Sequence, residues 1–419
     1  MTKVLIVGVG MTPFLKPSST NPQYFDLAAL AIRRALRDAN LDFTGIQQAV
    51  AGFCYSESTA GQRALYTVGM TGIPVYNVNN FGCTGGTTIV LSKLLIESGQ
   101  AECVLAFGFE KMSPGTLPLF PREKSSTELI QRQMDRLNVP PDFSIALQVF
   151  AHAGREYMEK YGANPTLFAK VAFKNHYNSR LNPYAQFMTP YTLKEIQESP
   201  TLVDPLTKLQ CSPTSDGAAA VILCSEAFAR RHGLLDQAVE ILGLALRTDL
   251  PSTFSEDSRI KLVGYDMTKT AAQQAFKEAN LTPDDVDVAE VYDCFSINEV
   301  LSYEALGLCE EGKAGEFVDR GLNTYGGKVV VNPSGGLISR GHPIGATGIA
   351  QCVELCWHLR GMAGERQVKG AKIALHHNMG LGGAAAVGLY KKYNQIQVLR
   401  PDQSSDHFEL ISQETKPKL

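Results

Sequence analysis

The segment Ala35-Leu36-Arg37-Asp38-Ala39-Asn40-Leu41 has a counterpart 240 residues later, in Ala275-Phe276-Lys277-Glu278-Ala279-Asn280-Leu281. Two further landmarks recur in the same order: Thr84-Gly85 returns as Thr347-Gly348, and Gly217-Ala218-Ala219-Ala220-Val221 returns as Gly383-Ala384-Ala385-Ala386-Val387. Repetition of this kind is typical of architectures built from similar units. The sequence therefore predicts two halves that share one topology.

The spacing of these landmarks locates an insertion in the first half. The second and third landmarks lie 263 and 166 residues from their counterparts, so the first half holds 97 additional residues (263 − 166) between them. Several prolines fall in this stretch, which favours loops and helices over sheet. We predict an N-terminal half of residues 1–110 and 217–235, a loop domain of residues 111–216, a C-terminal half of residues 236–393 and a mobile tail of residues 394–419.

Apolar runs alternate with amphipathic runs in both halves. The strand-like runs are Val4–Val9, Val104–Phe109, Val286–Val291 and Ile373–His376, and the helical runs are Asp26–Ala39, Thr87–Glu97 and Ile349–Leu359. Continuous apolar strands joined by helices indicate a largely parallel sheet that is covered on both faces. The sequence thus predicts an α/β protein with two-fold pseudosymmetry.

Composition excludes several classes of protein. The 419 residues include 39 Lys and Arg against 42 Asp and Glu, a balance that argues against a nucleic-acid binder held by phosphate contacts. No apolar stretch approaches the roughly 20 residues that a membrane span requires. The nine cysteines are odd in number and have no CxxC spacing, so neither a disulfide framework nor a structural zinc site is expected.

Reactive residues gather in four segments, each of which lies at a predicted strand end or helix start. Cys83 stands in the glycine-rich stretch 79–86 before a helix, where the helix N-terminus lowers a thiol pKa. Tyr292 and Cys294 follow a strand and are candidate proton donors. His342 lies in a Gly/Pro loop, and histidine is the side chain best able to take a proton near neutral pH. A packed turn at Cys83 and a packed strand end at Tyr292 are the structural alternatives.

The fourth segment runs from His376 to Gly383. Its repeated glycines allow backbone N–H groups to approach a ligand closely. The adjacent His376 and His377 raise the question of a metal, but no carboxylate or cysteine stands at a matching spacing. We therefore expect no metal.

Together these segments resemble the thiolase superfamily, and within it the thiolase domain of the sterol carrier protein type. The resemblance covers Val4 to Tyr393. It rests on Gln62-Arg63-Ala64, Gly69-Met70-Thr71-Gly72-Ile73-Pro74, Gly108-Phe109-Glu110-Lys111-Met112-Ser113, Pro213-Thr214-Ser215-Asp216-Gly217-Ala218-Ala219, Asn332–Gly341 and His342-Pro343-Ile344-Gly345-Ala346-Thr347-Gly348. It implies the thiolase fold, in which two βαβαβαββ halves form a five-layered α-β-α-β-α core with an inserted loop domain. It also implies a thiolase domain alone, with no lipid-transfer domain in this sequence.

The resemblance further implies a site for a coenzyme A thioester, with coenzyme A as a substrate and no permanently bound cofactor. Transferred by position, His342 is the base and oxyanion donor, and Cys294 is the cysteine that moves a proton of the carbon nucleophile. Gly82, Asn378 and Gly380 belong to the backbone that holds the oxyanion. His376 and Asp293 are expected near the substrate, and a homodimer is expected because members of the fold are generally dimers or tetramers.

Two positions depart from the family pattern. The acylated cysteine of the family aligns with Gly82, and Cys83 is one residue late, which is about 100° of rotation at a helix start. Tyr292 replaces the histidine of the HDCF motif, and a phenol with a pKa near ~10 is a poor base at neutral pH.

Three hypotheses follow from these departures. The first is acyl transfer between 3-oxoacyl-CoA and CoA in lipid or fatty-acid metabolism, with Cys83 as the nucleophile or with reduced activity. The second is an aldolase, lyase or thioesterase that acts on a CoA thioester without a covalent intermediate, using Tyr292 and His342. The third is an acyl-CoA binding protein without catalysis.

The chain ends in Pro417-Lys418-Leu419, which differs by one residue from the peroxisomal signal Ser-Lys-Leu. The ending predicts a peroxisomal protein recognised by an import receptor. The cytosol and the mitochondrion are the alternatives.

Overall fold

The computed structural model describes residues 2–113, 125–136 and 144–393. The tail of residues 394–419 lies outside the described residues, as does the peroxisomal-like ending. Within the described part of the chain, no helix is both long enough and apolar enough to cross a membrane.

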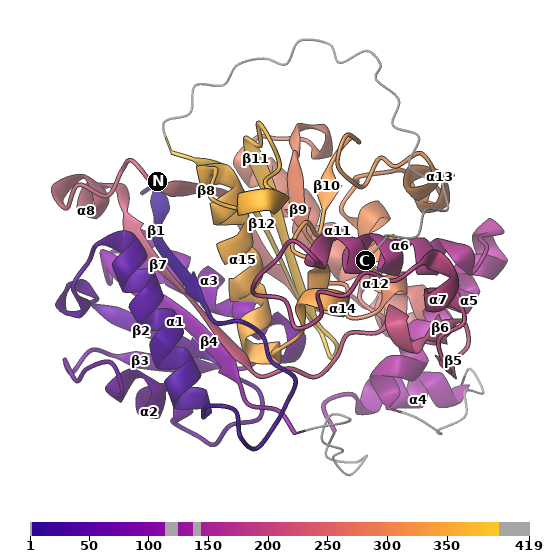
Figure 1. The fold of residues 1–419 in the computed structure, drawn as a ribbon, viewed down its shortest axis with the longest axis horizontal. Coiled ribbons are helices and arrows are strands. Elements are labelled where there is room, and N and C mark those ends of the chain that lie inside the picture. Colours follow the sequence, from indigo (N-terminus) through magenta and orange to yellow (C-terminus); the bar gives the residue numbers. More distant parts are fainter. Residues whose placement is uncertain (1, 114–124, 137–143, 394–419) are drawn as a thin grey trace, which may run out of the picture.

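Ten strands form a single mixed sheet (Figure 1). The first half contributes β1 (Val4–Met11), β2 (Gln48–Gly52), β3 (Val75–Val78), β4 (Cys103–Glu110) and β7 (Gly217–Ser225). The second half contributes β8 (Val239–Arg247), β9 (Val288–Glu290), β10 (Val330–Val331), β11 (Ile373–Gly380) and β12 (Ala384–Lys392). These bounds extend or trim the predicted strands by a few residues at most.

The strand order confirms the predicted two-fold relation. The sheet runs β3-β2-β4-β7-β1 and then β8-β12-β11-β9-β10, so the second half repeats the first in reverse. The halves join where Leu5 pairs with Glu240 and Ile6 with Val239. In each half three neighbouring strands pair in parallel, β3-β2-β4 and β10-β9-β11, whereas the last strand along the chain, β7 or β12, is antiparallel to both its neighbours. The sheet is therefore mixed, and less parallel than the sequence predicted.

Helices cover the sheet on both sides and fill the space between its halves. In the middle, α3 (Thr84–Glu97) packs against α15 (Ile344–Arg360), which is buried along almost its whole length. The outer helices are α1 (Tyr24–Ala39) and α2 (Ala60–Tyr66) on the first half, and α11 (Tyr265–Ala279) and α12 (Ser296–Ala305) on the second. The short helices are α8 (Glu226–Arg231), α9 (Ser252–Ser255), α10 (Arg259–Leu262), α13 (Ala314–Asp319) and α14 (Gly336–Arg340). This arrangement is the predicted thiolase fold.

The repeated landmarks occupy equivalent places in the two halves. Asn40 and Asn280 end α1 and α11 in the left-handed conformation, with φ of 49° and 53°, which asparagine tolerates better than most residues. Gly85 and Gly348 meet where α3 and α15 cross, and a Cβ on Gly85 would lie 2.6 Å from the backbone nitrogen of Gly348. Only glycine allows this approach, so the repeat marks the contact between the halves.

The stretch between β4 and β7 contains α4 (Glu128–Arg136), α5 (Ile145–Tyr161), α6 (Thr166–Ser179), α7 (Leu193–Gln197) and the two-stranded pair β5 (Thr201–Val203) and β6 (Leu206–Thr207). Although it interrupts the first half in the sequence, it packs on the second half: α5 and α6 contact α12, and α6 contacts α14 (Figure 1). It therefore covers a cavity that residues of both halves also line. The boundaries of the three units stay predictions.

Candidate functional site

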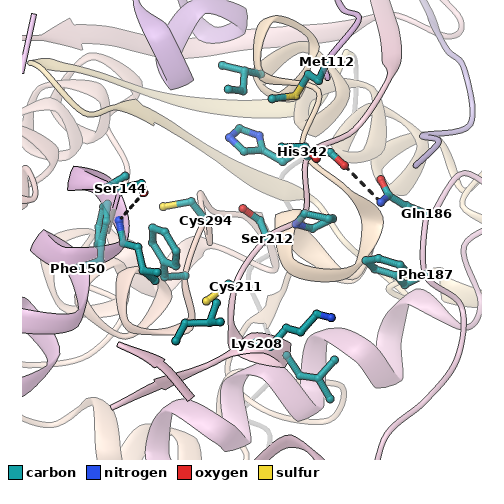
Figure 2. A pocket seen from close by; sticks show the side chains of 18 of the residues that line it. Met112, Ser144, Phe150, Gln186, Phe187, Lys208, Cys211, Ser212, Cys294 and His342 are labelled. Carbon is teal, nitrogen blue, oxygen red and sulfur yellow. Dashed lines mark hydrogen bonds between the residues drawn. The ribbon is translucent and has the colours of Figure 1, made fainter. Parts of the chain in front are cut away.

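A cavity of about 750 Å³ opens between the insertion and the two halves (Figure 2). Tyr292, Cys294 and His342, which come from separate segments of the chain, all line it. Their shared cavity is the spatial relation on which the predicted site depends. Apolar side chains form much of the remaining wall: Phe81, Met112, Ala146, Leu147, Phe150, Leu202, Leu209, Phe295, Ile344, Met379 and Leu381.

Tyr292 and His342 form a hydrogen-bonded pair in the cavity wall. Tyr292 follows β9, and His342 stands in the turn between α14 and α15. The tyrosine hydroxyl lies 2.9 Å from His342 Nε2, and the two rings meet edge to face with centroids 5.3 Å apart. On the other side of the imidazole, Nδ1 lies 2.7 Å from Thr347 Oγ1. The three side chains thus form a continuous chain of hydrogen bonds that ends at the cavity.

Burial decides which member of the pair carries the proton. It lowers the pKa of His342 to about 3, and the nearby positive charge of Arg340 acts in the same direction. Burial also raises the pKa of Tyr292 well above its ordinary value, and the neighbouring Cys294 raises it further. The resting pair at neutral pH is therefore a neutral phenol and a neutral imidazole.

Cys294 lies two residues beyond Tyr292, and its sulfur is directed toward the cavity (Figure 2). Its backbone is fixed by the insertion, because the Ser212 N–H donates to the Cys294 carbonyl at 2.9 Å. Burial raises the pKa of this thiol well above its usual range, and Asp293 adds to the shift. Cys294 is consequently a protonated thiol that can give a proton to a carbon atom beside it.

Gly82 lies beside the tyrosine hydroxyl, in a short 3-10 turn (Phe81–Cys83) that begins with a positive φ of 49° at Phe81. A Cβ placed on Gly82 would lie 2.1 Å from Tyr292 Oη and 2.5 Å from the Met379 carbonyl oxygen. Tyr292 therefore occupies the space into which a side chain at position 82 would point.

Cys83 is turned away from the cavity. It does not line the cavity; its thiol donates to the Asn378 carbonyl at 3.2 Å and packs among Ala384, Ala386 and neighbouring apolar side chains. The sequence led us to expect a pKa lowered by the helix start. Burial instead raises the pKa of Cys83 to about 12. The structure does not bring this thiol together with His342.

The predicted oxyanion residues connect β11 to the turn that holds Gly82. The Asn378 amide accepts a hydrogen bond from the Gly86 N–H at 2.8 Å and donates to the Gly82 carbonyl at 2.9 Å. Gly380 packs against the same turn, since a Cβ there would meet the Asn80 carbonyl at 2.3 Å. Gly82, Asn378 and Gly380 do not line the cavity, whereas His342 and Met379 do.

His376 and Asp293 are buried and do not line the cavity. His376 is fully buried in β11, where its Nδ1 lies 3.1 Å from the Tyr390 hydroxyl. Asp293 is also fully buried and accepts hydrogen bonds from the backbone N–H groups of Leu337 and Ile338. Its carboxylate thereby caps the start of α14, the helix that leads to His342.

Two further contacts around the His342 turn were not foreseen from the sequence. Arg340, the last residue of α14, forms a fully buried ion pair with Glu290 at 3.0 Å, and Ser334 donates to the same carboxylate. Glu110 accepts the backbone N–H of Gly345 at the start of α15, and burial raises the pKa of Glu110 to about 7. Residues far apart in the sequence thus hold both sides of the turn.

The described residues contain no cluster of three His, Cys, Asp or Glu side chains that could hold a metal ion. The cavity does include two lysines, Lys16 and Lys208. The residues at the site thus offer acid–base chemistry and cationic contacts.

Comparisons with known proteins found matches over most of the chain. Residues 4–227 match the family model of the thiolase N-terminal domain, and residues 252–389 match the model described as thiolase C-terminal domain-like. The chain is 55% identical to sterol carrier protein 2 of Gallus gallus over 93% of this chain and 71% of that protein. It is 48% identical to non-specific lipid-transfer protein-like 2 of Caenorhabditis elegans, over 93% and 96% of the two chains.

Solved structures show the same fold. One described as an Ltp2-ChsH2(DUF35) aldolase has a TM-score of 0.80 at 23% identity, covering 94% of this chain and 99% of that one. Human mitochondrial 3-ketoacyl-CoA thiolase in complex with CoA has a TM-score of 0.68 at 20% identity, covering 93% and 98%.

Proposed function

Because this chain belongs to the thiolase family, we propose that it acts on coenzyme A thioesters, and that it does so without an acyl-enzyme intermediate. Tyr292, His342 and Cys294 would break or form the carbon–carbon bond next to the thioester by proton transfer alone. The reaction class is that of an aldolase acting on a 3-hydroxyacyl-CoA.

The observation that carries this proposal is the position of the Tyr292 hydroxyl. It lies where a side chain at position 82 would be and 2.9 Å from His342 Nε2. The phenol therefore takes the place of a nucleophile beside the imidazole. Cys83, the thiol next along the chain, is buried on the other side of the turn with a pKa of about 12. A thiol in that state is a weak nucleophile.

The proposed reaction balances without free CoA. The β-hydroxyl of the substrate gives its proton to Tyr292 Oη as the phenol proton moves to His342 Nε2. The Cα–Cβ bond breaks, the former hydroxyl oxygen becomes the carbonyl of the leaving aldehyde or ketone, and the bond electrons enter the thioester enolate. Cys294 then protonates Cα, and the proton on His342 returns to the Cys294 sulfur. Negative charge develops on the enolate while His342 becomes a positively charged imidazolium. The attraction between the two charges stabilises both.

The cavity suits the two ends of such a substrate. Lys16 and Lys208 offer positive charge for the phosphates of coenzyme A, and the apolar wall around Phe150, Leu202 and Phe295 suits an acyl chain. CoA occupies a thiolase of this fold in the human mitochondrial complex. Another structure of the same fold is described as an aldolase, so the fold accommodates this class of reaction as well.

The first testable prediction separates this reaction from acyl transfer. Tyr292→Phe should lower kcat for cleavage of a 3-hydroxyacyl-CoA by about 10²–10⁴-fold, because the proton acceptor is lost while the ring remains. Cys83→Ala should keep kcat within about threefold, because this thiol does not reach the cavity. Cleavage should need no free CoA. Mass spectrometry of the acyl-CoA and carbonyl products measures both variants.

The companion assay offers 3-oxoacyl-CoA with free CoA. Turnover that depends on CoA and disappears in Cys83→Ala, with an acyl group found on Cys83, would establish acyl transfer and overturn the proposal. Release of free CoA and a carboxylic acid would identify a thioesterase. Binding of CoA esters without turnover of any of them would identify an acyl-CoA binding protein.

We also propose that the protein is a homodimer joined through β3. This strand is the last in the sheet and pairs with β2 on one side. The strand and the segment before it carry exposed apolar side chains: Tyr76 in β3 is 39% exposed, and Tyr66 and Met70 are 50% and 76% exposed. An open strand edge flanked by apolar side chains favours pairing with a second copy.

The peroxisomal location and the import receptor stay predictions from the sequence.

The dimer proposal predicts a change in mass on charge insertion. The wild-type chain of 45.6 kDa should elute as a dimer, and Met70→Glu with Tyr76→Glu should elute as a folded monomer, because carboxylates would repel across a two-fold contact. Met362→Glu is the control, since Met362 is 57% exposed and lies after α15. Light scattering after size exclusion measures the mass. A wild-type monomer, or a double variant that remains a dimer, would count against β3 pairing.

A further inference from the structure

Thr347 makes two contacts that bear on the proton arrangement of the site. It is fully buried in the first turn of α15, one helical turn beyond the loop that carries His342. Its Oγ1 lies 2.7 Å from His342 Nδ1 and 3.0 Å from the Pro343 carbonyl oxygen. The three atoms are all enclosed, so water does not compete for either contact.

The contact between Thr347 and Pro343 sets the direction of the other bonds. A carbonyl oxygen only accepts, so the hydrogen bond to Pro343 uses the single hydroxyl hydrogen of Thr347. The hydroxyl oxygen must then accept a hydrogen from His342 Nδ1. A neutral imidazole carries one N–H, so Nε2 is left with a lone pair, and the Tyr292 hydroxyl donates to it.

The opposite tautomer, with hydrogen on Nε2, would reverse these hydrogen bonds and remove the acceptor that the Tyr292 hydroxyl needs. With hydrogen on Nε2, Thr347 would have to donate to Nδ1, and the Pro343 carbonyl would lose its hydroxyl donor and keep only the backbone N–H groups of Ala346 and Thr347. Tyr292 would accept from Nε2, and its own hydrogen would point elsewhere. Nε2 would then have no lone pair with which to receive the phenol proton.

We propose that Thr347 is a positioning residue that holds His342 in the Nδ1–H tautomer, so that Nε2 is always ready to accept the Tyr292 proton. The consequence for catalysis rests on the proposed function, whereas the tautomer itself does not. Thr347 does not line the cavity. Its hydroxyl acts through the imidazole on the phenol, and sets the direction in which the proton leaves the substrate.

The test measures the tautomer directly. In ¹⁵N-labelled wild-type protein, the His342 signals should show a pyrrole-type Nδ1 and a pyridine-type Nε2, assigned among the eight histidines by the signals missing in His342→Gln. Thr347→Val keeps the shape of the side chain but removes the hydroxyl, and should shift His342 toward a mixture of tautomers. Its kcat should fall about tenfold with little change in KM, in line with the loss of one neutral hydrogen bond. Thr347→Ser should restore both the tautomer and kcat.

Thr84→Val is the matched control, because Thr84 begins α3 as Thr347 follows the start of α15, and its hydroxyl contacts the Asn80 N–H rather than an imidazole. It should leave the His342 nitrogen signals unchanged. A wild-type Nε2–H tautomer, or a Thr347→Val protein that keeps the pure Nδ1–H tautomer, would overturn the inference. An inactive wild-type protein with the expected nitrogen signals would contradict the proposed function and leave the tautomer inference intact.

Discussion

Gly82→Cys combined with Tyr292→His should take up an acyl group from 3-oxoacyl-CoA, whereas the wild-type protein should take up none. A Cβ on residue 82 would lie 2.1 Å from the Tyr292 hydroxyl, so the cysteine needs the phenol to be absent. Histidine is shorter and leaves that space open beside His342. We expect a covalent adduct approaching one acyl group per chain, measured by intact-protein mass spectrometry and located on the introduced cysteine by peptide mapping.

The single variants serve as its controls. Gly82→Cys alone should be destabilised by about 1–3 kcal/mol through overpacking and should form little adduct. Tyr292→His alone has no thiol in the cavity at this position. The Met379 carbonyl oxygen lies 2.5 Å from the same Cβ, so it must shift both in Gly82→Cys alone and in the double variant. The free-energy cost of this shift is therefore common to the two proteins. An adduct that forms equally in Gly82→Cys alone would show that the tyrosine does not block the position.

Glu290→Ala should cost about 3–5 kcal/mol of unfolding free energy, because it leaves the guanidinium of Arg340 buried without a counter-charge. The two side chains are wholly enclosed and lie 3.0 Å apart. That loss is a large part of the ~5–15 kcal/mol that stabilises an ordinary domain. Urea unfolding followed by fluorescence or circular dichroism measures it.

Two further variants serve as references for the loss of unfolding free energy in Glu290→Ala. Glu102→Ala removes an exposed ion pair with Arg231 and should cost less than about 1 kcal/mol. Glu290→Leu combined with Arg340→Met removes both buried charges and should recover much of the loss. Equal losses in Glu290→Ala and Glu102→Ala would show that the buried pair contributes no more than a surface pair.

The fold was predictable because the two halves of the chain carry the same sequence landmarks in the same order. Asn40 and Asn280 end equivalent helices, and the Gly-Ala-Ala-Ala-Val landmarks lie at the start of equivalent strands, β7 and β12. The helical and apolar periods also gave the positions of α1, α3, β4 and β11 to within a few residues. The antiparallel direction of β7 and β12 was not foreseen, since an apolar run does not reveal the direction in which a strand enters a sheet.

The site was predictable in part. The family resemblance of the segments around His342 and Cys294 predicted that these two side chains would share a pocket, and Tyr292 stands two residues before Cys294. The sequence left open whether Cys83 faces that pocket, since one residue of rotation in a short turn decides the matter. The buried contacts of Asp293, Glu290 and Thr347 were beyond it, because they join segments whose proximity only the folded chain reveals.

The meeting of Gly85 and Gly348 has a consequence for how the site tolerates change. With no side chain between them, the first turns of α3 and α15 rest backbone on backbone. One of these turns follows Gly82 and the other follows His342. A methyl group added at either glycine would push these two turns apart, and would move Gly82 away from the His342 loop without altering any residue that takes part in the reaction.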